Sequence, residues 1–241
     1  MSFVGRFTAL SAGVIVAAAF QASGSVIYQS SSGQLEATAE FSVSGNNLIV
    51  RLSNSSLFDV GVPADILTAV FFDIDGAAGL TRVSGLLSGG SVVHFGPNGG
   101  ANVGGEWAYA EGLGGAPLGA STGISSSGFG LFGPGNLFPG ANLEGPASPD
   151  GMNYGLVSIG DNVAIGNAAV TGNFPLIQHQ VTFTLSGLPN GFDLTGKIGK
   201  VSFQYGTDLG SEPNIPGALI PAPGAVALLG LGGLLVSRRR R

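Results

Sequence analysis

Apolar and polar residues alternate along several short segments of this chain. Residues 35–43 (LEATAEFSV) alternate throughout, and residues 48–53 (LIVRLS) follow the turn-like sequence SGNN. Because successive side chains of a strand point to opposite faces, these two segments predict a β-hairpin. In residues 180–185 (QVTFTL) the apolar side chains point to one face and the threonines to the other. Such alternation is typical of strands with one face against a core.

Other segments are rich in β-branched and aromatic residues without strict alternation. They are residues 65–74, 91–96, 106–110, 154–159, 179–188 and 200–206. Between the two ends of the chain, no segment has sustained helical periodicity. Short strands, turns rich in glycine and asparagine, and the lack of crossover helices predict an all-β fold. We expect an antiparallel β-sandwich that resembles a jelly roll.

The composition supports a β domain and excludes two other classes of protein. The chain has 241 residues, of which 43 are glycine, and charged residues make up 10%. A helix bundle does not tolerate so much glycine, and a solvated disordered chain needs more charge. The length suits one domain of ordinary size. Glycine, proline, serine and alanine concentrate in residues 112–151, which therefore predict long glycine-rich loops.

Charge is distributed unevenly along the chain. Arg6 and the four C-terminal arginines account for five of the nine basic residues, so the body keeps four. All 14 acidic residues lie in the body, which therefore carries a net charge of −10. Nucleic acid is an unfavourable partner for such a surface, because its phosphates need Lys and Arg. The lack of cysteine excludes disulfides, thiolate nucleophiles and Cys-based zinc sites.

The start of the chain has the three parts of a secretory signal peptide. Arg6 precedes an apolar stretch at residues 7–20, and small residues follow at residues 22–25. Cleavage after Gly24 would place small residues at the two positions that require them. The alternative is a core helix or an uncleaved anchor, but the apolar run is short for a span of about 20 residues. We therefore expect a signal helix at residues 1–24, removed by signal peptidase.

The end of the chain combines prolines, a short apolar run and a basic cluster. Prolines keep the first part extended, and residues 224–236 are all apolar or glycine. As a helix this run would reach only about 20 Å, short of a hydrocarbon core of about 30 Å. Arginines 238–241 would hold that end in the cytoplasm. We expect a β domain at residues 25–214, followed at residues 215–241 by a linker and a short transmembrane helix.

This ending resembles the sorting signal of the PEP-CTERM family, which exosortases process in Gram-negative bacteria. The matching residues are Pro221, Ala222, Pro223, the apolar run, and Arg238, Arg239, Arg240 and Arg241. Ala222 stands where the family usually has glutamate. The resemblance implies a transient inner-membrane anchor and removal of the tail by a membrane-embedded, transpeptidase-like protease. The product would be displayed at the cell surface or in exopolysaccharide.

The middle of the chain is similar to the ectodomain of some exosortase-dependent surface proteins. The similar phrases are VFFDI, GGEWAY, GISSSGFG, YGLVSIGDN, VTFTLSGL and VSFQYGT. This second resemblance implies a β-rich surface domain without an established chemistry. It therefore bears on location and not on substrate.

Three short glycine motifs match fingerprints of catalytic or phosphate-binding loops. Residues 128–133 fit GxGxxG, residues 191–197 fit the front of a P-loop, and residues 119–123 fit GxSxG. All three motifs function only where a helix follows. GxSxG also requires a histidine within reach of its serine, and the chain has only two, His94 and His179. Because 43 glycines produce such matches by chance, we expect turns at these places and no enzyme.

Asp73 and Asp75 are the weak candidates for calcium ligands. Two positions apart in an extended segment, they share a face. Together with Asp150, Asp161 or backbone carbonyls they could supply some of the six to eight oxygens that Ca²⁺ prefers. The alternative is a strand end with solvated acids. We predict no other cofactor and no catalytic residue.

Four aromatic residues are candidates for stacking on sugar rings if they are exposed: Trp107, Tyr109, Tyr154 and Tyr205. Aromatic residues of strands more often lie in the core. The sequence thus leads to an exported surface or matrix protein with a structural or interaction role, in contact with exopolysaccharide or other surface proteins. The alternatives are a carbohydrate-binding module, with or without calcium, and then a secreted hydrolase.

Overall fold

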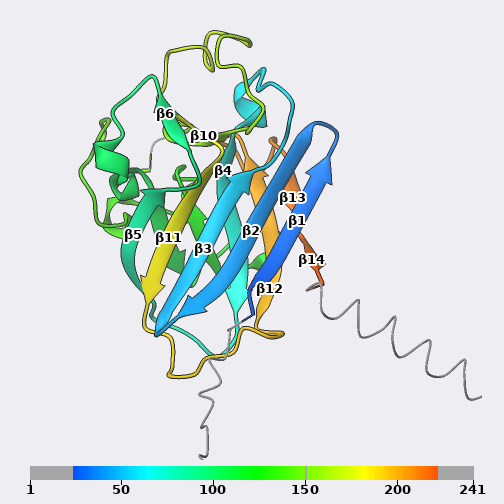
Figure 1. The fold of residues 1–241 in the computed structure, drawn as a ribbon, viewed down its shortest axis with the longest axis vertical. Coiled ribbons are helices and arrows are strands. Elements are labelled where there is room, and N and C mark those ends of the chain that lie inside the picture. The colour runs from blue at the N-terminus through cyan, green and yellow to red at the C-terminus, as the bar shows by residue number, and fades with distance from the viewer. Residues whose placement is uncertain (1–23, 150, 222–241) are drawn as a thin grey trace, which may run out of the picture.

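The computed structural model describes residues 24–149 and 151–221, which form two β-sheets packed face to face (Figure 1). Within these residues the only helices are five 3₁₀ turns of three residues each, so the all-β prediction is confirmed. The strands are β1 Val26–Ser32, β2 Leu35–Ser44, β3 Asn47–Asn54, β4 Leu67–Ile74, β5 Thr81–Leu87, β6 Val92–His94, β7 Ala108–Glu111, β8 Thr122–Ser125, β9 Leu156–Val157, β10 Leu176–Gln178, β11 Gln180–Ser186, β12 Ile198–Tyr205, β13 Asn214–Pro216 and β14 Ala218–Ile220.

The first sheet has the order β14-β1-β2-β3-β11-β5, and every pair in it is antiparallel. Strands β2 and β3 form the expected hairpin, with Phe41 opposite Val50. The turn between them consists of Gly45 and Asn46, and Gly45 adopts a φ of +60°, which glycine adopts without strain. Alternation in these strands therefore correctly predicted both the pairing and the buried face.

The second sheet has the order β13-β12-β4-β9-β10-β6, and the hairpin β7–β8 adds to β4. Among the described pairs only β9–β10 is parallel, which departs from the purely antiparallel sheet that we expected. The chain between these two strands, residues 158–175, leaves the sheet as a long loop and returns to the same end. A hairpin turn would have reversed the direction, whereas this long excursion allows the parallel pairing.

Side chains of both sheets share one core. Phe41 of the first sheet and Phe72 of the second lie with ring centroids 5.0 Å apart. The ring centroids of Trp107 and Phe183 are also 5.0 Å apart. All four side chains are fully buried. Burial of each contributes about 1.5–3 kcal/mol or more to folding. This shared core holds the two sheets together as one unit.

The folded part extends further toward the C-terminus than the sequence predicted. We expected a linker from residue 215, but β13 pairs with β12 and β14 pairs with β1. Pro216 lies in β13, which has only one neighbouring strand, and an edge position tolerates the missing N–H. We predicted a linker because proline lowers strand propensity. Proline does not, however, exclude an edge strand.

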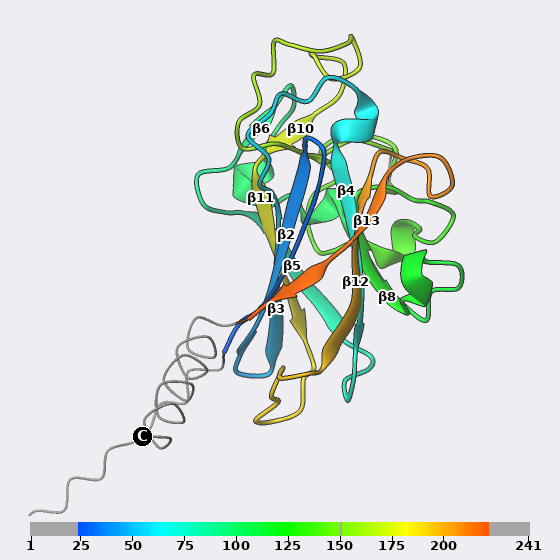
Figure 2. The ribbon, with the colours of Figure 1, turned by 90° about the vertical axis from the view of Figure 1, so that its right-hand side faces the viewer.

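The two described chain ends lie side by side at one end of the molecule. Ile27 pairs with Ile220, so the first and last strands are neighbours (Figure 2). We call this end the tail pole; it also carries the β2–β3 turn and residues 187–197 (Figure 1). The opposite end, the loop pole, consists of residues 33–36, 55–66, 158–175 and 206–213.

The signal helix expected at residues 1–24 lies outside the described part except for Gly24, and the sorting-signal helix expected at residues 224–236 lies entirely outside it. In residues 24–149 and 151–221 there is no helix with the length and apolar character needed to span a membrane.

Candidate functional site

The loop pole is built by backbone hydrogen bonds between its two longest loops. The N–H of Ile159 donates to the carbonyl of Asn54 at 3.2 Å, and that of Gly160 donates to Ser56 at 3.2 Å. A side chain at Gly160 would clash with the carbonyl of Leu57, so only glycine permits this approach. The loops 55–66 and 158–175 therefore form one ordered surface.

Two aspartates clasp these loops reciprocally. Asp59 accepts a hydrogen bond from the N–H of Asn162 at 2.9 Å, and Asp161 accepts one from the N–H of Val60 at 2.8 Å. Asp65 accepts from the N–H groups of Gly61 and Val62 in the same loop. In these hydrogen bonds each carboxylate accepts from backbone N–H groups, and none of the three forms an ion pair with Lys or Arg among the described residues.

The environment of Asp161 opposes its ionisation. Burial raises the pKa of Asp161 most strongly, and the charge of Asp59 raises it further. The N–H of Val60 and the nearby His94 lower the pKa, but they do not outweigh burial. Gln178 connects His94 to this loop. Its amide oxygen lies 2.9 Å from Nε2 of His94, and its amide nitrogen donates to the backbone carbonyl of Asp161 at 3.0 Å. Ionisation of Asp161 is therefore unfavourable in the folded protein, chiefly because the carboxyl group is partly buried.

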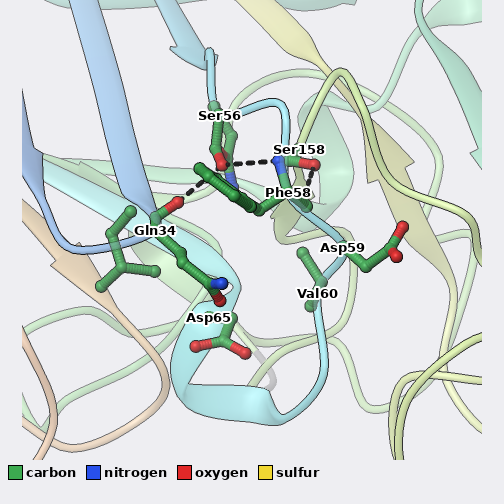
Figure 3. Close-up of a pocket in the computed structure, with 9 residues that line it drawn as sticks. Gln34, Ser56, Phe58, Asp59, Val60, Asp65 and Ser158 are labelled. Atoms are coloured by element: carbon green, nitrogen blue, oxygen red, sulfur yellow. Dashed lines mark hydrogen bonds between the residues drawn. The ribbon is translucent and has the colours of Figure 1, made fainter.

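A small hollow lies beneath the loop 55–66 (Figure 3). Ser56 donates to the carbonyl of Gln34 at 2.6 Å and accepts from the N–H of Phe58 at 3.1 Å, which fixes the hollow's upper wall. The amide oxygen of the buried Asn54, which also lines it, has no hydrogen-bonding partner among the described residues. With a volume of about 10 Å³, the hollow matches a single water molecule and excludes a sugar ring or an organic cofactor.

Large apolar side chains are exposed on the outer surface of the same loops. They are Leu57, Phe58, Val62, Ile159, Ile165 and Phe174, six of the 13 such side chains among the described residues. Exposed apolar groups gathered in one place, with polar groups around them, mark interaction surfaces. Because the hollow below is so small, recognition at this pole would use the outer surface.

The loop pole also differs in charge from the rest of the body. Its four segments contain no Lys or Arg. They contain six acidic residues: Glu36, Asp59, Asp65, Asp161, Asp208 and Glu212. The body's basic residues lie elsewhere, with Arg51 bound to Glu40 at 2.8 Å and Arg82 near the start of β5. Lys197 directly precedes β12, and Lys200 lies near the start of that strand. The loop pole is therefore both apolar and negative.

The calcium candidates Asp73 and Asp75 lie at the tail pole and line one open hollow of about 350 Å³. Lys200 contacts Asp73 at 2.9 Å, and Lys197 contacts Asp75 at 3.0 Å. Burial raises the pKa of Asp73, but the hydrogen bonds from Lys200 and Ser121 outweigh it and lower the pKa overall. Two ammonium groups already compensate these carboxylates, so a calcium ion would have to displace both lysines. Asp161 does not line this hollow, and Asp150 lies outside the described residues.

The GxSxG segment does not have the surroundings of a nucleophile elbow. A 3₁₀ turn, Pro117–Gly119, precedes Ser121, and strand β8 follows it. The Ser121 hydroxyl donates to Asp73 at 2.8 Å, while the His94 ring contacts Gln178. Burial lowers the pKa of His179, and no described contact joins it to Ser121. The geometry gives Ser121 a structural role in holding Asp73.

The two other glycine motifs form turns. Residues 128–133 precede the 3₁₀ turn Pro134–Asn136, with no longer helix in the described residues that follow. Residues 191–197 lead directly into β12, and Lys197 contacts Asp75 instead of pointing into a phosphate cradle. Both segments therefore lack the helix N-terminus that a phosphate site requires.

The candidate sugar-stacking aromatics lie in the core. Trp107, Tyr109, Tyr154 and Tyr205 are all buried, as the structural alternative predicted. The Tyr154 hydroxyl donates to the carbonyl of Pro97 at 2.9 Å, and that of Tyr109 donates to Glu111 at 2.5 Å. These rings have no exposed face for a sugar, so the carbohydrate alternative loses its aromatic platform.

Of the sorting-signal residues, only Pro221 is described, and it directly follows β14. Ala222, Pro223 and Arg238 to Arg241 lie outside the described part. Comparisons with protein-family models, with curated proteins and with solved structures found no match to this chain.

Proposed function

We propose that this chain is an exported bacterial surface or matrix protein that an exosortase sorts, and that it acts by interaction rather than catalysis. The signal-peptide pattern and the Pro–apolar–Arg ending support export and sorting. In this proposal the exosortase and signal peptidase are partners during export, and other surface proteins or exopolysaccharide surround the mature domain.

The single observation that carries the proposal is the position of the two chain ends. Since Ile27 pairs with Ile220, the described chain begins and ends at the tail pole (Figure 2). A domain held there would present the loop pole, with its exposed apolar side chains, away from the attachment. We further propose that the two packed sheets constitute a jelly-roll-like β-sandwich, an architecture that places loops at its ends.

The sorting proposal is tested in a Gram-negative strain that encodes an exosortase, by intact mass and location of the product. We expect a surface product that lacks the first 24 residues and Arg238 to Arg241. Replacement of all four arginines by glutamine should leave the tail uncleaved. Lys197→Gln, which removes a partly exposed basic residue of the body, should be processed normally and serves as the matched control.

A surface product that still carries Arg238 to Arg241 would overturn the sorting proposal. A product confined to the cytoplasm would overturn export as well.

A further inference from the structure

We propose that the loop pole binds a polypeptide partner that presents an apolar face flanked by Lys or Arg side chains. This inference rests on the interaction role proposed above and specifies the chemistry of the partner. It follows from three properties of the same surface: exposed apolar groups, fixed geometry and uncompensated negative charge.

Four large apolar side chains of the loop pole have a large part of their surface in contact with water. The exposed fractions are 79% for Leu57, 53% for Phe58, 44% for Ile159 and 48% for Ile165. Backbone hydrogen bonds from residues 159–160 to residues 54–56 hold the segment of Ile159 beside the loop that carries Leu57 and Phe58. The N–H of Asn167 donates to Gly61 at 2.9 Å and holds the segment of Ile165 beside the same loop. A partner that covers these side chains would gain the free energy of removing them from water.

The surface is fixed before a partner arrives. Besides the reciprocal aspartate bonds, Ser158 donates to the carbonyl of Phe58 at 2.5 Å and Gln178 donates to that of Ile159 at 3.3 Å. A surface whose backbone is already hydrogen-bonded loses little conformational freedom on binding. Binding to the loop pole therefore need not order a flexible loop.

The charge distribution selects among partners. None of the three ion pairs among the described residues includes an acidic residue of the loop pole. A basic partner would be attracted and would compensate the carboxylates, whereas anionic lipid and nucleic acid would be repelled. A second copy of the chain is also disfavoured, because its own body carries ten net negative charges. The hollow of about 10 Å³ is too small to hold a sugar ring.

The test uses the full chain, purified from whichever cell fraction contains it, so that its outcome does not depend on sorting. The probe is a fluorescent amphipathic peptide with leucine at helical spacing and lysine elsewhere, and binding is followed by anisotropy. We expect binding that weakens as salt increases. The same peptide with glutamate in place of lysine should bind at least about tenfold more weakly.

Variants locate the binding surface. Leu57→Ser combined with Ile159→Ser should lower the affinity for the lysine peptide by about tenfold or more, because exposed apolar anchors dominate such interfaces. Val83→Ser combined with Leu219→Ser removes two apolar side chains of similar exposure on β5 and β14, and should leave the affinity unchanged. Asp59→Asn keeps an oxygen acceptor for Asn162 but removes the charge, and should reduce both the affinity and its salt dependence.

Equal affinities of the two double variants would overturn the proposal, since the peptide would then adhere through general charge. Equal binding of the glutamate peptide would overturn it as well. Stronger binding of phosphatidylglycerol vesicles or dextran than of the lysine peptide would assign the surface to a lipid or a glycan. Self-association that Leu57→Ser and Ile159→Ser abolish would assign it to a second copy. Failure of the sorting test alone would leave these results unaffected.

Discussion

The two poles of the domain treat the same side chain, aspartate, in different ways. At the tail pole, Asp73 and Asp75 each contact a lysine ammonium, so their charges are compensated. At the loop pole, Asp59, Asp65 and Asp161 contact only backbone N–H groups in their described hydrogen bonds. Backbone donors fix a carboxylate in place without cancelling its charge. The placement of the few basic residues, rather than of the acids, therefore decides which pole can attract a positively charged partner.

The poles also differ in how their backbone is held. The tail pole is formed largely by strand ends and short turns, whereas the loop pole depends on contacts between segments about a hundred residues apart, such as Asn54 and Ile159. These contacts join the two loops to each other, so a substitution that breaks them should affect the loops before the core. The core between the poles supports both of them.

Removal of Trp107 should have the largest effect, because both poles depend on the core that it fills. Trp107→Ala should lower the free energy of unfolding by about 3–5 kcal/mol, measured by denaturant titration. Phe58→Ala is the matched control, since this ring is half exposed at the loop pole, and it should cost less than about 1 kcal/mol. A small effect of Trp107→Ala would contradict the shared core.

Gly160→Ala should disturb the loop pole and spare the tail pole. The added methyl group would clash with the backbone of Leu57, and relieving that clash should cost about 1–3 kcal/mol. Hydrogen exchange should increase at residues 55–66 and 158–175. Gly114→Ala, where a methyl group meets no atom within 4 Å, provides the control. Exchange that increases equally at both poles would show that the loops are not a separate unit.

Asp73→Asn should weaken the tail pole at neutral pH. Burial raises the pKa of Asp73, but Lys200 and Ser121 lower it below its ordinary value, so the ionised form stabilises the fold. This contribution is present above the ordinary pKa and is lost as the pH falls through the lowered one. We expect a loss of up to about 1 kcal/mol at neutral pH, vanishing in strong acid, by thermal unfolding. A loss that persists in strong acid would indicate a packing effect instead.

Asp161→Asn should increase the stability of the protein at neutral pH, whereas Asp73→Asn should decrease it. Because burial raises the pKa of Asp161, the folded state binds more protons than the unfolded state between the ordinary pKa and the raised one. Stability therefore falls as the pH rises through that window, and the ionised group costs stability at neutral pH. The amide keeps an acceptor for Val60, and because solvent screens this partly exposed group, the variant should gain only a few tenths of a kcal/mol at neutral pH. A loss of similar size would show that ionised Asp161 does not cost stability in the folded protein.

Alternating segments were the most predictable part of the fold. Residues 35–43 and 48–53 became β2 and β3 because each has one face against the core. Strand β5 was not predicted, since Gly85 interrupts it and its exposed valine and leucine obscure the alternation. Strands β13 and β14 were missed because proline residues surround them. Pairing with neighbours supplies the stability that these edge strands lack locally.

The loop pole had no signature in the sequence. Its four segments are separated by whole strands, and only the fold brings Asp59 to Asn162 and Asp161 to Val60. The motifs that did stand out, such as GxSxG, reflected abundant glycine. The stretch without Lys or Arg, from residue 83 to residue 196, contains only one of the four segments, residues 158–175, so it did not identify the pole.

The proposal that the domain is exported and presents its loop pole away from its attachment can be tested by chemical labelling. Because the chain has no cysteine, single cysteines report on each pole: Ala168→Cys on the loop pole and Ser44→Cys on the tail pole. Intact producing cells are treated with a bulky, membrane-impermeant maleimide, and labelling rates are compared with those of the purified variants. We expect the loop-pole cysteine to be labelled as rapidly as in the purified protein, and the tail-pole cysteine to be labelled more slowly than in the purified protein. Labelling of neither cysteine before lysis, or faster labelling at the tail pole, would contradict it.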